Sequence, residues 1–478
     1  MASLLDRAGR PVPDAALAEF ARGLRGATLS PGDPGYDEAR RVFNAMVDRR
    51  PGLVVQPLDA AGIQHAVRFA RRHDVLVSIK GGGHSAPGHA VCNDGLLIDL
   101  CRMRAVRVDP EARTAVAEGG ATWGEFDAAT QGHGLAVTGG RIRGTGIGGL
   151  TLGSGSGWLE RKFGYTVDSL VAADVVLASG DLVRASDHEH QDLFWGLRGG
   201  GGNYGIVVRF EYRLHALGPL VWGGMLLFPR DGREREVLRA YRDFMEAAPD
   251  EVGGAAALVT VPPLPMIPEA ARGKAALAII AVYLGHPGEA EAAFEPMLRL
   301  QPAAALVQPM PYLAVQGLLD EANQPGKRNY WKADTCPSLP DAALDALLGA
   351  TARPASPLTT VLLQPMGGAA ARVPDDATAM GWRQAKWSLH VLGMWEDASD
   401  DARQVSWVRA VTGAMAPWAQ KATYLNYLMD EGEGRVRDSF GPHYAQMVAL
   451  KDKYDPTNFF CMNQNIKPTA HLGGVAGM

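Results

Sequence analysis

The sequence predicts an α+β fold, and three observations lead to that class. Short runs of β-branched and aliphatic residues, such as residues 75–79, have the length and composition of strands. Between such runs, apolar residues recur at helical spacing, as in Leu17, Phe20 and Leu24. Near residue 217 the glycine-rich composition gives way to proline-rich loops, which indicates a second domain.

The N-terminal half alternates expected helices and strands. Asp14 is followed by apolar residues at helical spacing and is expected to cap a helix, and a second helix is expected after Asp59. Thr122 and Glu125 form a capping-box pattern, which predicts that a helix begins there. Residues 173–185 predict a hairpin that turns at Ser179-Gly180-Asp181. Further strands are expected at residues 75–79, 96–100, 105–108 and 206–208.

The C-terminal half predicts a layered domain of sheet and helix. Strands are expected at residues 222–228, 255–261 and 275–284, and helices at residues 233–247 and 288–300. Short polar motifs return in the last part of the chain. The expected domains are therefore residues 1–216, 217–420 and 421–478.

Composition and charge exclude several classes of protein. With 47% hydrophobic residues and a net charge of -5, the chain has the profile of a globular protein and lacks the basic stripe of a nucleic-acid binder. Its four cysteines are far apart and form no CxxC pair, which predicts no metal site and no disulfide framework and suits a reducing cytoplasm. The N-terminus has no secretory-signal pattern, and the longest apolar run, residues 275–284, is too short to span a membrane.

Glycine is the unusual feature of the composition. The chain has 57 glycines in 478 residues, about 12% against a typical ~7%. They concentrate in residues 81–95, 139–157 and 199–205. Glycine lets backbone approach a ligand closely, so three such loops indicate one extended ligand with a pyrophosphate. Because the chain has neither a GxxxxGK[ST] motif nor a GxGxxG strand–turn–helix unit, we expect a dinucleotide held outside a Rossmann fold.

Five motifs occur in the order in which a known family carries them. They are Gly82-Gly83-His84-Ser85 with Gly88, residues 145–149, residues 192–195 with 200–205, Tyr424-Leu425-Asn426, and residues 453–458 with 463–465. With these motifs the chain resembles the vanillyl-alcohol-oxidase/p-cresol-methylhydroxylase (PCMH) superfamily of FAD-linked oxidases, in its berberine-bridge-enzyme-like branch. The resemblance implies a PCMH-type FAD-binding domain of two α+β subdomains, a substrate domain of antiparallel sheet covered by helices, and a C-terminal segment that completes the FAD site.

The resemblance also implies a single covalent link to FAD. His84 matches the histidine that bonds to the flavin 8α-methyl group. Many relatives carry a second link through a cysteine, but Ile142 occupies that position here. The residues expected to bind FAD are Lys80, Gly81, Gly82, Gly83, His84, Ser85, Gly88, Thr145, Gly146, Gly148, Gly149, Gly153, Gly202, Asn203, Gly205, Val207, Asn463 and Asn465.

The catalytic base is harder to assign, because the family glutamate is missing. Alanines follow Gly367-Gly368, where plant relatives carry it, and Leu362 occupies the nearby sheet position that a bacterial relative uses. Tyr424 matches a tyrosine that deprotonates the substrate in sugar-oxidising relatives. His390 and Tyr330 are the other candidates, and Thr145 matches a threonine beside flavin N5 in relatives that form a flavin-N5-oxide.

The leading hypothesis is an oxidase that takes a hydride from a small alcohol, amine or phenolic, polyketide-like substrate and returns the electrons to O2. The alternatives are a flavin-N5-oxide oxygenase of secondary metabolism, an NADPH-dependent reductase of similar fold, and a non-catalytic binding protein. Neither a nucleic-acid nor a membrane partner is expected. Trp331, Trp382, Trp387 and Trp395 favour a hydrophobic or aromatic substrate, while the oligomeric state has no signal in the sequence.

Overall fold

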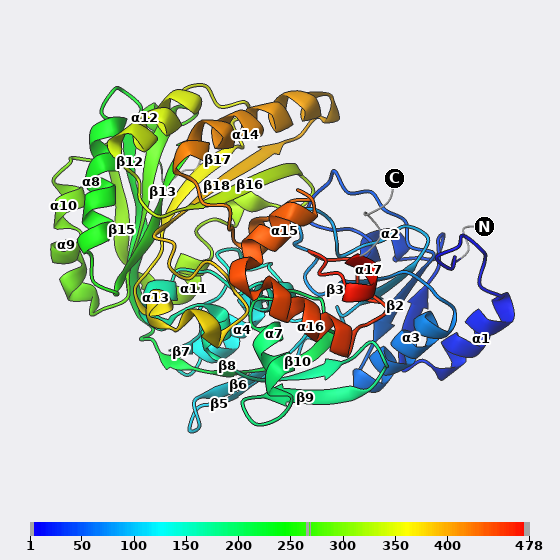
Figure 1. Ribbon diagram of the computed structural model, residues 1–478. Helices are drawn as coiled ribbons and strands as arrows, with labels where there is room; N and C mark the ends of the chain where they lie inside the picture. The colour runs from blue at the N-terminus through cyan, green and yellow to red at the C-terminus, as the bar shows by residue number, and fades with distance from the viewer. Residues whose placement is uncertain (1–3, 264–266, 268, 473–478) are drawn as a thin grey trace.

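The fold consists of four sheets with helices packed around them. The computed structural model describes residues 4–263, 267 and 269–472. Figure 1 shows a large sheet with outer helices at the upper left, a smaller sheet in blue at the right, and a third along the bottom. The C-terminal helices α15 (Glu433–Phe440) and α16 (Tyr444–Tyr454) lie between them. The sequence-predicted α+β class is confirmed.

The N-terminal sheet has four strands in the order β1-β2-β4-β3. Strand β4 is parallel to both of its neighbours, β2 and β3, and β1 is antiparallel to β2. The helix predicted after Asp59 is confirmed, and Asp59 caps it, since its carboxylate accepts a hydrogen bond from Gly62 N (3.0 Å). The cap predicted at Asp14 is wrong: Pro13 occupies that position, and Asp14 is the first helical residue, where its charge still favours the helix dipole. The elements are α1 (Asp14–Gly23), β1 (Gly26–Leu29), α2 (Tyr36–Ala39), β2 (Leu53–Pro57), α3 (Ala60–Arg72), β3 (Val77–Lys80) and β4 (Leu96–Asp99).

The second sheet is antiparallel, in the order β5-β6-β10-β8-β9. Strands β8 and β9 form the predicted hairpin. The predicted capping box is also present, because the Glu125 carboxylate accepts a hydrogen bond from the Thr122 amide (2.9 Å) at the start of α4. The elements are β5 (Val106–Asp109), β6 (Thr114–Glu118), α4 (Trp123–Gln131), β7 (Leu135–Ala136), α5 (Ile147–Leu152), α6 (Glu160–Phe163), β8 (Leu170–Val176), β9 (Leu182–Ser186), α7 (Gln191–Leu197), β10 (Ile206–Arg213) and β11 (His215–Ala216), which pairs with β7.

The largest sheet has seven antiparallel strands in the order β15-β12-β14-β13-β17-β18-β16. Helices α8, α12 and α14 cover one face and share a core with it. Residues 275–284, the longest apolar run, form a strand of this sheet as predicted. The elements are β12 (Leu220–Pro229), α8 (Glu234–Ala247), β13 (Val252–Thr260), β14 (Ala275–Tyr283), α9 (Ala290–Ala293), α10 (Glu295–Leu298), β15 (Ala304–Pro311), α11 (Tyr312–Gln316), β16 (Arg328–Cys336), α12 (Asp341–Ala350), β17 (Thr360–Pro365), α13 (Ala369–Arg372), β18 (Trp387–Trp395) and α14 (Asp401–Met415).

The single helix predicted over residues 288–300 is wrong. The chain there forms the short helices α9 and α10, with a break at Phe294. Pro296 lies in the first turn of α10, and its ring excludes the hydrogen bond that would continue the helix from α9.

The large sheet contains only strands between residues 220 and 395, and the other sheets only strands between 26 and 216. The exact domain boundaries at residues 217 and 421 stay a prediction. After α16, the C-terminal segment returns to the N-terminus, where Arg7 donates a hydrogen bond to Phe459 O (3.1 Å), and ends with α17 (Thr469–Leu472). None of the helices in the described part of the chain has the length and apolar character needed to cross a bilayer.

Candidate active site

A cavity of about 870 Å³ lies between the glycine-rich loops and the uncovered face of the seven-stranded sheet. This volume falls in the upper part of the range of ligand sites, roughly 300–1,000 Å³. All three glycine-rich segments and the C-terminal segment contribute to its wall. Of the residues expected to bind FAD, those that line it are Gly81, Gly82, Gly83, His84, Ser85, Thr145, Gly146, Gly148, Gly149, Gly202, Gly205, Val207 and Asn463.

Glycine is required where the first two loops meet. A Cβ atom on Gly82 would lie 2.3 Å from Gly146 N, and one on Gly146 would lie 2.3 Å from Gly82 N. The two loops therefore touch through their main chains. At Gly149 and Gly202 a Cβ would instead meet open space, because both glycines border the cavity. Side chains at these two positions would fill the space beside the main chain. Because glycine leaves that space open, the loops fit an extended dinucleotide such as FAD.

The other residues expected to bind FAD lie behind the cavity wall. Lys80 is buried and forms an ion pair with Asp99 (3.3 Å), and Gly88 packs against Val47 with a φ of +77°. Gly153 leaves room for Asn426, whose side chain a Cβ would overlap. These residues lie outside the cavity lining, and so do Asn203 and Asn465.

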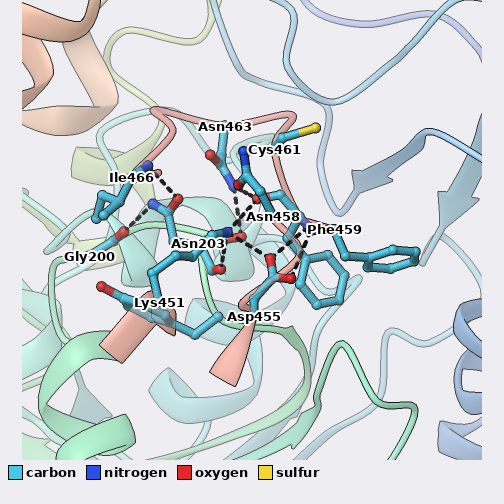
Figure 2. A network of polar contacts seen from close by, with 12 residues as sticks. Gly200, Asn203, Lys451, Asp455, Asn458, Phe459, Cys461, Asn463 and Ile466 are labelled. Atoms are coloured by element: carbon cyan, nitrogen blue, oxygen red, sulfur yellow. Dashed lines mark hydrogen bonds and ion pairs between the residues drawn. The ribbon is translucent and has the colours of Figure 1, made fainter. Parts of the chain in front are cut away.

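Asn203 joins the third loop to the C-terminal segment. Its amide nitrogen donates hydrogen bonds to Gly200 O (2.8 Å) and Gln464 O (3.1 Å), and its amide oxygen accepts one from Ile466 N (2.9 Å). In Figure 2 the side chain lies between the two segments. The side-chain amide nitrogen of Asn463 donates a further hydrogen bond to Gly202 O (2.9 Å). The third loop and the segment that follows α16 therefore form one part of the wall.

A buried ion pair anchors that segment. Lys451 and Asp455, both fully buried, lie 2.7 Å apart. Lys451 also donates to Asn203 O (2.8 Å) and Phe460 O (2.9 Å), and Asp455 accepts from the amides of Phe459 and Phe460. Because every charge in this pair has several hydrogen-bond partners, burial costs less than it would for a bare pair. The network holds Asn463 at the cavity edge.

His84 lies on the cavity wall beside two aromatic rings. Its ring centroid is 4.1 Å from that of Phe43 and 6.3 Å from that of Trp331. Burial lowers the pKa of His84 to about 4, so the imidazole is neutral at pH 7. Ile142 also lines the cavity, whereas none of the four cysteines does. His84 is therefore in the cavity lining at the position of the family's histidine, and the position of the family's cysteine holds Ile142.

Tyr424 lines the cavity, and two hydrogen-bond donors hold its hydroxyl group. Its oxygen accepts from Ser156 N (3.0 Å) and Asn426 Nδ2 (2.9 Å), and its side chain is otherwise buried. Burial raises the pKa of Tyr424 above its ordinary value. With both lone pairs engaged, the hydroxyl proton can only be donated to another group. The same donors would stabilise the phenolate, as would the nearby charge of Arg141.

His390 lines the cavity from β18. Its ring stacks on Tyr427 at a centroid distance of 3.7 Å and meets Trp331 edge to face at 5.3 Å. It is only 2% exposed, and neither ring nitrogen has a hydrogen-bond partner among the described residues. Burial and then the charge of Arg141 hold its pKa well below 6.5. The result is a neutral imidazole with unused hydrogen-bonding capacity.

Tyr330 lies away from the cavity, because adjacent strand residues point to opposite faces of a sheet. Its hydroxyl accepts a hydrogen bond from Arg409 Nε (3.2 Å). Trp331, its neighbour on β16, lines the cavity instead. Of the four tryptophans that favoured an aromatic substrate, only Trp331 belongs to the described lining.

Sequence reasoning missed Arg141, a buried cation in the cavity wall. It pairs with Glu160 (3.4 Å) and donates to Ser156 Oγ (3.0 Å) and Tyr427 OH (3.5 Å). Burial lowers its pKa, but Glu160 together with Tyr427 and Tyr424 outweighs that effect, so the pKa of Arg141 is raised and the guanidinium stays charged. A charged residue inside a glycine cluster was the available signal. No group of acidic, histidine and cysteine side chains suited to a metal ion occurs in the described residues.

Comparisons with known proteins identify the family. Residues 51–186 match the FAD binding domain, and residues 423–467 match the family described as berberine and berberine like. The FAD-linked oxidoreductase pgmH of Aspergillus terreus is 30% identical, over 88% of this chain and 89% of the relative. The (R)-6-hydroxynicotine oxidase of Paenarthrobacter nicotinovorans is 25% identical, over 93% and 97%.

Solved structures show the same fold. The 6-hydroxy-D-nicotine oxidase of Arthrobacter nicotinovorans has a TM-score of 0.84 at 24% identity, over 93% of this chain and 98% of that one. A chitooligosaccharide oxidase has a TM-score of 0.82 at 21% identity, over 95% and 100%. Together with the FAD-binding and berberine-like segments, these matches show that the chain belongs to the berberine-bridge-enzyme-like branch of the FAD-linked oxidoreductases and is an FAD-dependent enzyme.

Proposed function

We propose that the protein is an oxidase that removes a hydride and a proton from a small organic molecule and uses O2 as the electron acceptor. When bound, FAD accepts the hydride and passes two electrons to O2, which leaves as H2O2. The observation that carries the proposal is the Tyr424 hydroxyl, held at the cavity by Ser156 N and Asn426 Nδ2. A hydroxyl group held in this way positions a substrate oxygen and accommodates negative charge if it gives up its proton.

In this proposal the glycine loops bind FAD and His84 holds it covalently through its imidazole. The half-buried ring lies on the cavity wall and is neutral, which leaves a nitrogen lone pair for a bond to carbon. Acid-precipitated protein should stay yellow, and the His84→Ala variant should release its colour into the supernatant. Free FAD released from the unmodified protein would contradict the link through His84.

The Tyr424→Phe variant tests the catalytic role. Reduction of the flavin by substrate without oxygen should slow by about 10²–10⁴-fold, the usual contribution of a positioned acid or base, while flavin content stays unchanged. With oxygen present, the unmodified enzyme should form one H2O2 for each substrate oxidised. Full turnover by the variant would remove Tyr424 from the mechanism.

A flavin-N5-oxide oxygenase is the second candidate, because Thr145 lines the cavity. Isotope-labelled oxygen gas separates the two activities. An oxygenase incorporates the label into its organic product, whereas an oxidase leaves it in H2O2. A dependence on NADPH in place of an organic substrate would instead identify a reductase.

A further inference from the structure

The substrate side of the cavity is an apolar sheet face. Alternate residues of neighbouring strands point into the cavity, because side chains alternate along a strand. Those on the central strands are Met225, Leu227, Val259, Ile280, Leu362 and Leu392. The loops and helices of the FAD-binding half close the opposite side. A ligand beside the flavin would therefore contact mainly hydrocarbon.

The sheet wall carries polar side chains at Thr260, Thr360, Gln364 and His390. His390 lies directly opposite Leu362 in the pairing of β17 with β18. Leu362 thus occupies the sheet position at which a bacterial relative carries a glutamate. Its cross-strand neighbour His390 is buried and neutral, and its ring nitrogens have no hydrogen-bond partner among the described residues. Gln364, also in the wall, donates its amide to Tyr427 OH (3.4 Å). Leaving both nitrogens of a buried imidazole unpaired is costly, which favours a ligand group that bonds to one of them.

The wall is unsuited to a sugar. A saccharide carries hydroxyl groups around its whole ring, and each would lose its water hydrogen bonds against the leucine, isoleucine and valine side chains. Of the sheet-strand residues in the described lining, Thr260, Thr360, Gln364 and His390 offer polar partners, and these are too few for the hydroxyl groups around a saccharide ring.

The wall is also unsuited to a charged substrate. The buried Arg141 would repel an ammonium group, and the only carboxylate in the described lining, Glu321, is exposed to solvent. Glu160 is already paired with Arg141. The two terminal nitrogens of the guanidinium are engaged by Ser156, Gly157 O, Glu160 and Tyr427, so only the buried Nε, which has no partner among the described residues, is left for an anion.

We infer that the cavity selects an uncharged, largely hydrocarbon alcohol, which places its hydroxyl group between His390 and Tyr424. This inference rests on the proposed oxidase function and names its substrate class. The substrate oxygen accepts a hydrogen bond from Tyr424 and donates its own proton to His390. Oxidation breaks the C–H bond, whose electron pair leaves with the hydrogen to FAD. The O–H proton passes to His390, and the product is a carbonyl compound.

A matched set of ligands tests this class on the FAD-loaded enzyme. The probes are 2-naphthalenemethanol, its ammonium analogue 2-naphthylmethylamine, 2-methylnaphthalene without a hydroxyl group, and cellobiose. Dissociation constants come from the change in flavin absorbance, which needs no turnover. The alcohol should bind about 10-fold or more tightly than the hydrocarbon and the amine, and about 100-fold more tightly than the disaccharide. Equal or tighter binding of cellobiose or of the amine would overturn the inference.

The His390→Phe variant tests the contact itself, because phenylalanine keeps the ring and removes both nitrogens. The preference for the alcohol over the hydrocarbon should fall to within about 2-fold, since the binding partner is gone. Tyr330→Phe, outside the cavity, is the control and should keep the full preference. If the preference survives in His390→Phe, His390 does not bind the hydroxyl group and the inference fails.

The binding and redox readouts separate the two proposals. If the alcohol binds with the expected preference but the flavin stays oxidised, the oxidase function fails while the substrate class holds. If cellobiose bleaches the flavin and yields H2O2, the oxidase function holds while the substrate class fails.

Discussion

The two walls of the cavity are built differently. The wall on the FAD side consists largely of main chain, with glycine at the points of closest approach, such as Gly82 and Gly146. The wall on the sheet side consists of side chains projecting from regular strands, such as Leu362 and Leu392. Tyr424 and Arg141 lie where the two walls meet.

This difference suits what each wall is proposed to bind. A dinucleotide is long and polar, and exposed backbone amides can follow it only where no Cβ intervenes. A substrate is selected by shape and by a few hydrogen bonds, and side chains on a rigid sheet supply both. Changes to the FAD wall should therefore affect cofactor content, and changes to the sheet wall should affect substrate affinity.

The largest effect is expected at Gly149. A Gly149→Leu variant should fold, because a Cβ there meets no atom within 4 Å, but its side chain would fill the space beside the loop. Flavin absorbance per protein should fall about 10-fold, as expected when an added side chain has no compensating contact. Gly144→Leu, also in open space but outside the described lining, is the control and should stay yellow. Equal flavin content in both variants would show that the loops do not hold the cofactor.

The sheet wall can be tested with two leucines on one strand. Leu392 faces the cavity and Leu389 faces the helices, where it is fully buried. Leu392→Ala should weaken binding of an apolar substrate by about 10- to 100-fold, given ~0.8 kcal/mol for each lost methylene contact, with flavin content unchanged. Leu389→Ala should instead lower the free energy of unfolding by about 2–5 kcal/mol and leave affinity near its original value. Titration and urea unfolding measure the two quantities, and the opposite assignment would contradict the geometry.

Asp127 gives a smaller effect at the contact between the two halves. It accepts a hydrogen bond from Gln316 Nε2 (2.8 Å), while Asp127 Oδ1 and Gln316 Oε1 are buried without partners. Burial raises the pKa of Asp127 to about 7, so the folded protein must carry a buried charge at pH 8. Asp127→Asn removes that charge and should raise the free energy of unfolding at pH 8 by about 1–3 kcal/mol. The gain should shrink at pH 5, where Asp127 is protonated; a gain of equal size at both pH values would contradict the raised pKa.

The smallest effect concerns the pH dependence of stability. The pKa of His390 is well below 6.5 when folded, so below pH 6.5 the unfolded chain binds a proton that the folded protein does not. The free energy of unfolding therefore falls as the pH drops below 6.5, by at most ~1.4 kcal/mol per pH unit from this residue. The slope should be shallower in His390→Phe than in the unmodified protein, as measured by urea unfolding at pH 5 and 6.5. Asp127 contributes a slope of opposite sign in both proteins, so it cancels in the difference. Equal slopes would mean that His390 is not held neutral.

The fold and the FAD-binding loops could be predicted from local patterns. The strand at residues 275–284, the helix after Asp59 and the capping box at Thr122 follow from residue order alone. His84 was found because it lies inside a contiguous motif. The prediction of one helix over residues 288–300 was wrong because Pro296 interrupts the helix, although the apolar residues there recur at helical spacing.

What the sequence determined by itself is the FAD side of the cavity, because closely spaced glycines and one histidine form contiguous segments that residue order preserves. Only the tertiary structure decided the substrate side. His390 meets Leu362 through strand pairing, Arg141 meets Tyr427 across 286 residues, and Trp331 rather than Tyr330 faces the cavity by sheet alternation. The physical reason is that a strand's partners and its inward face are set by long-range packing, which leaves no local signal in the residues themselves.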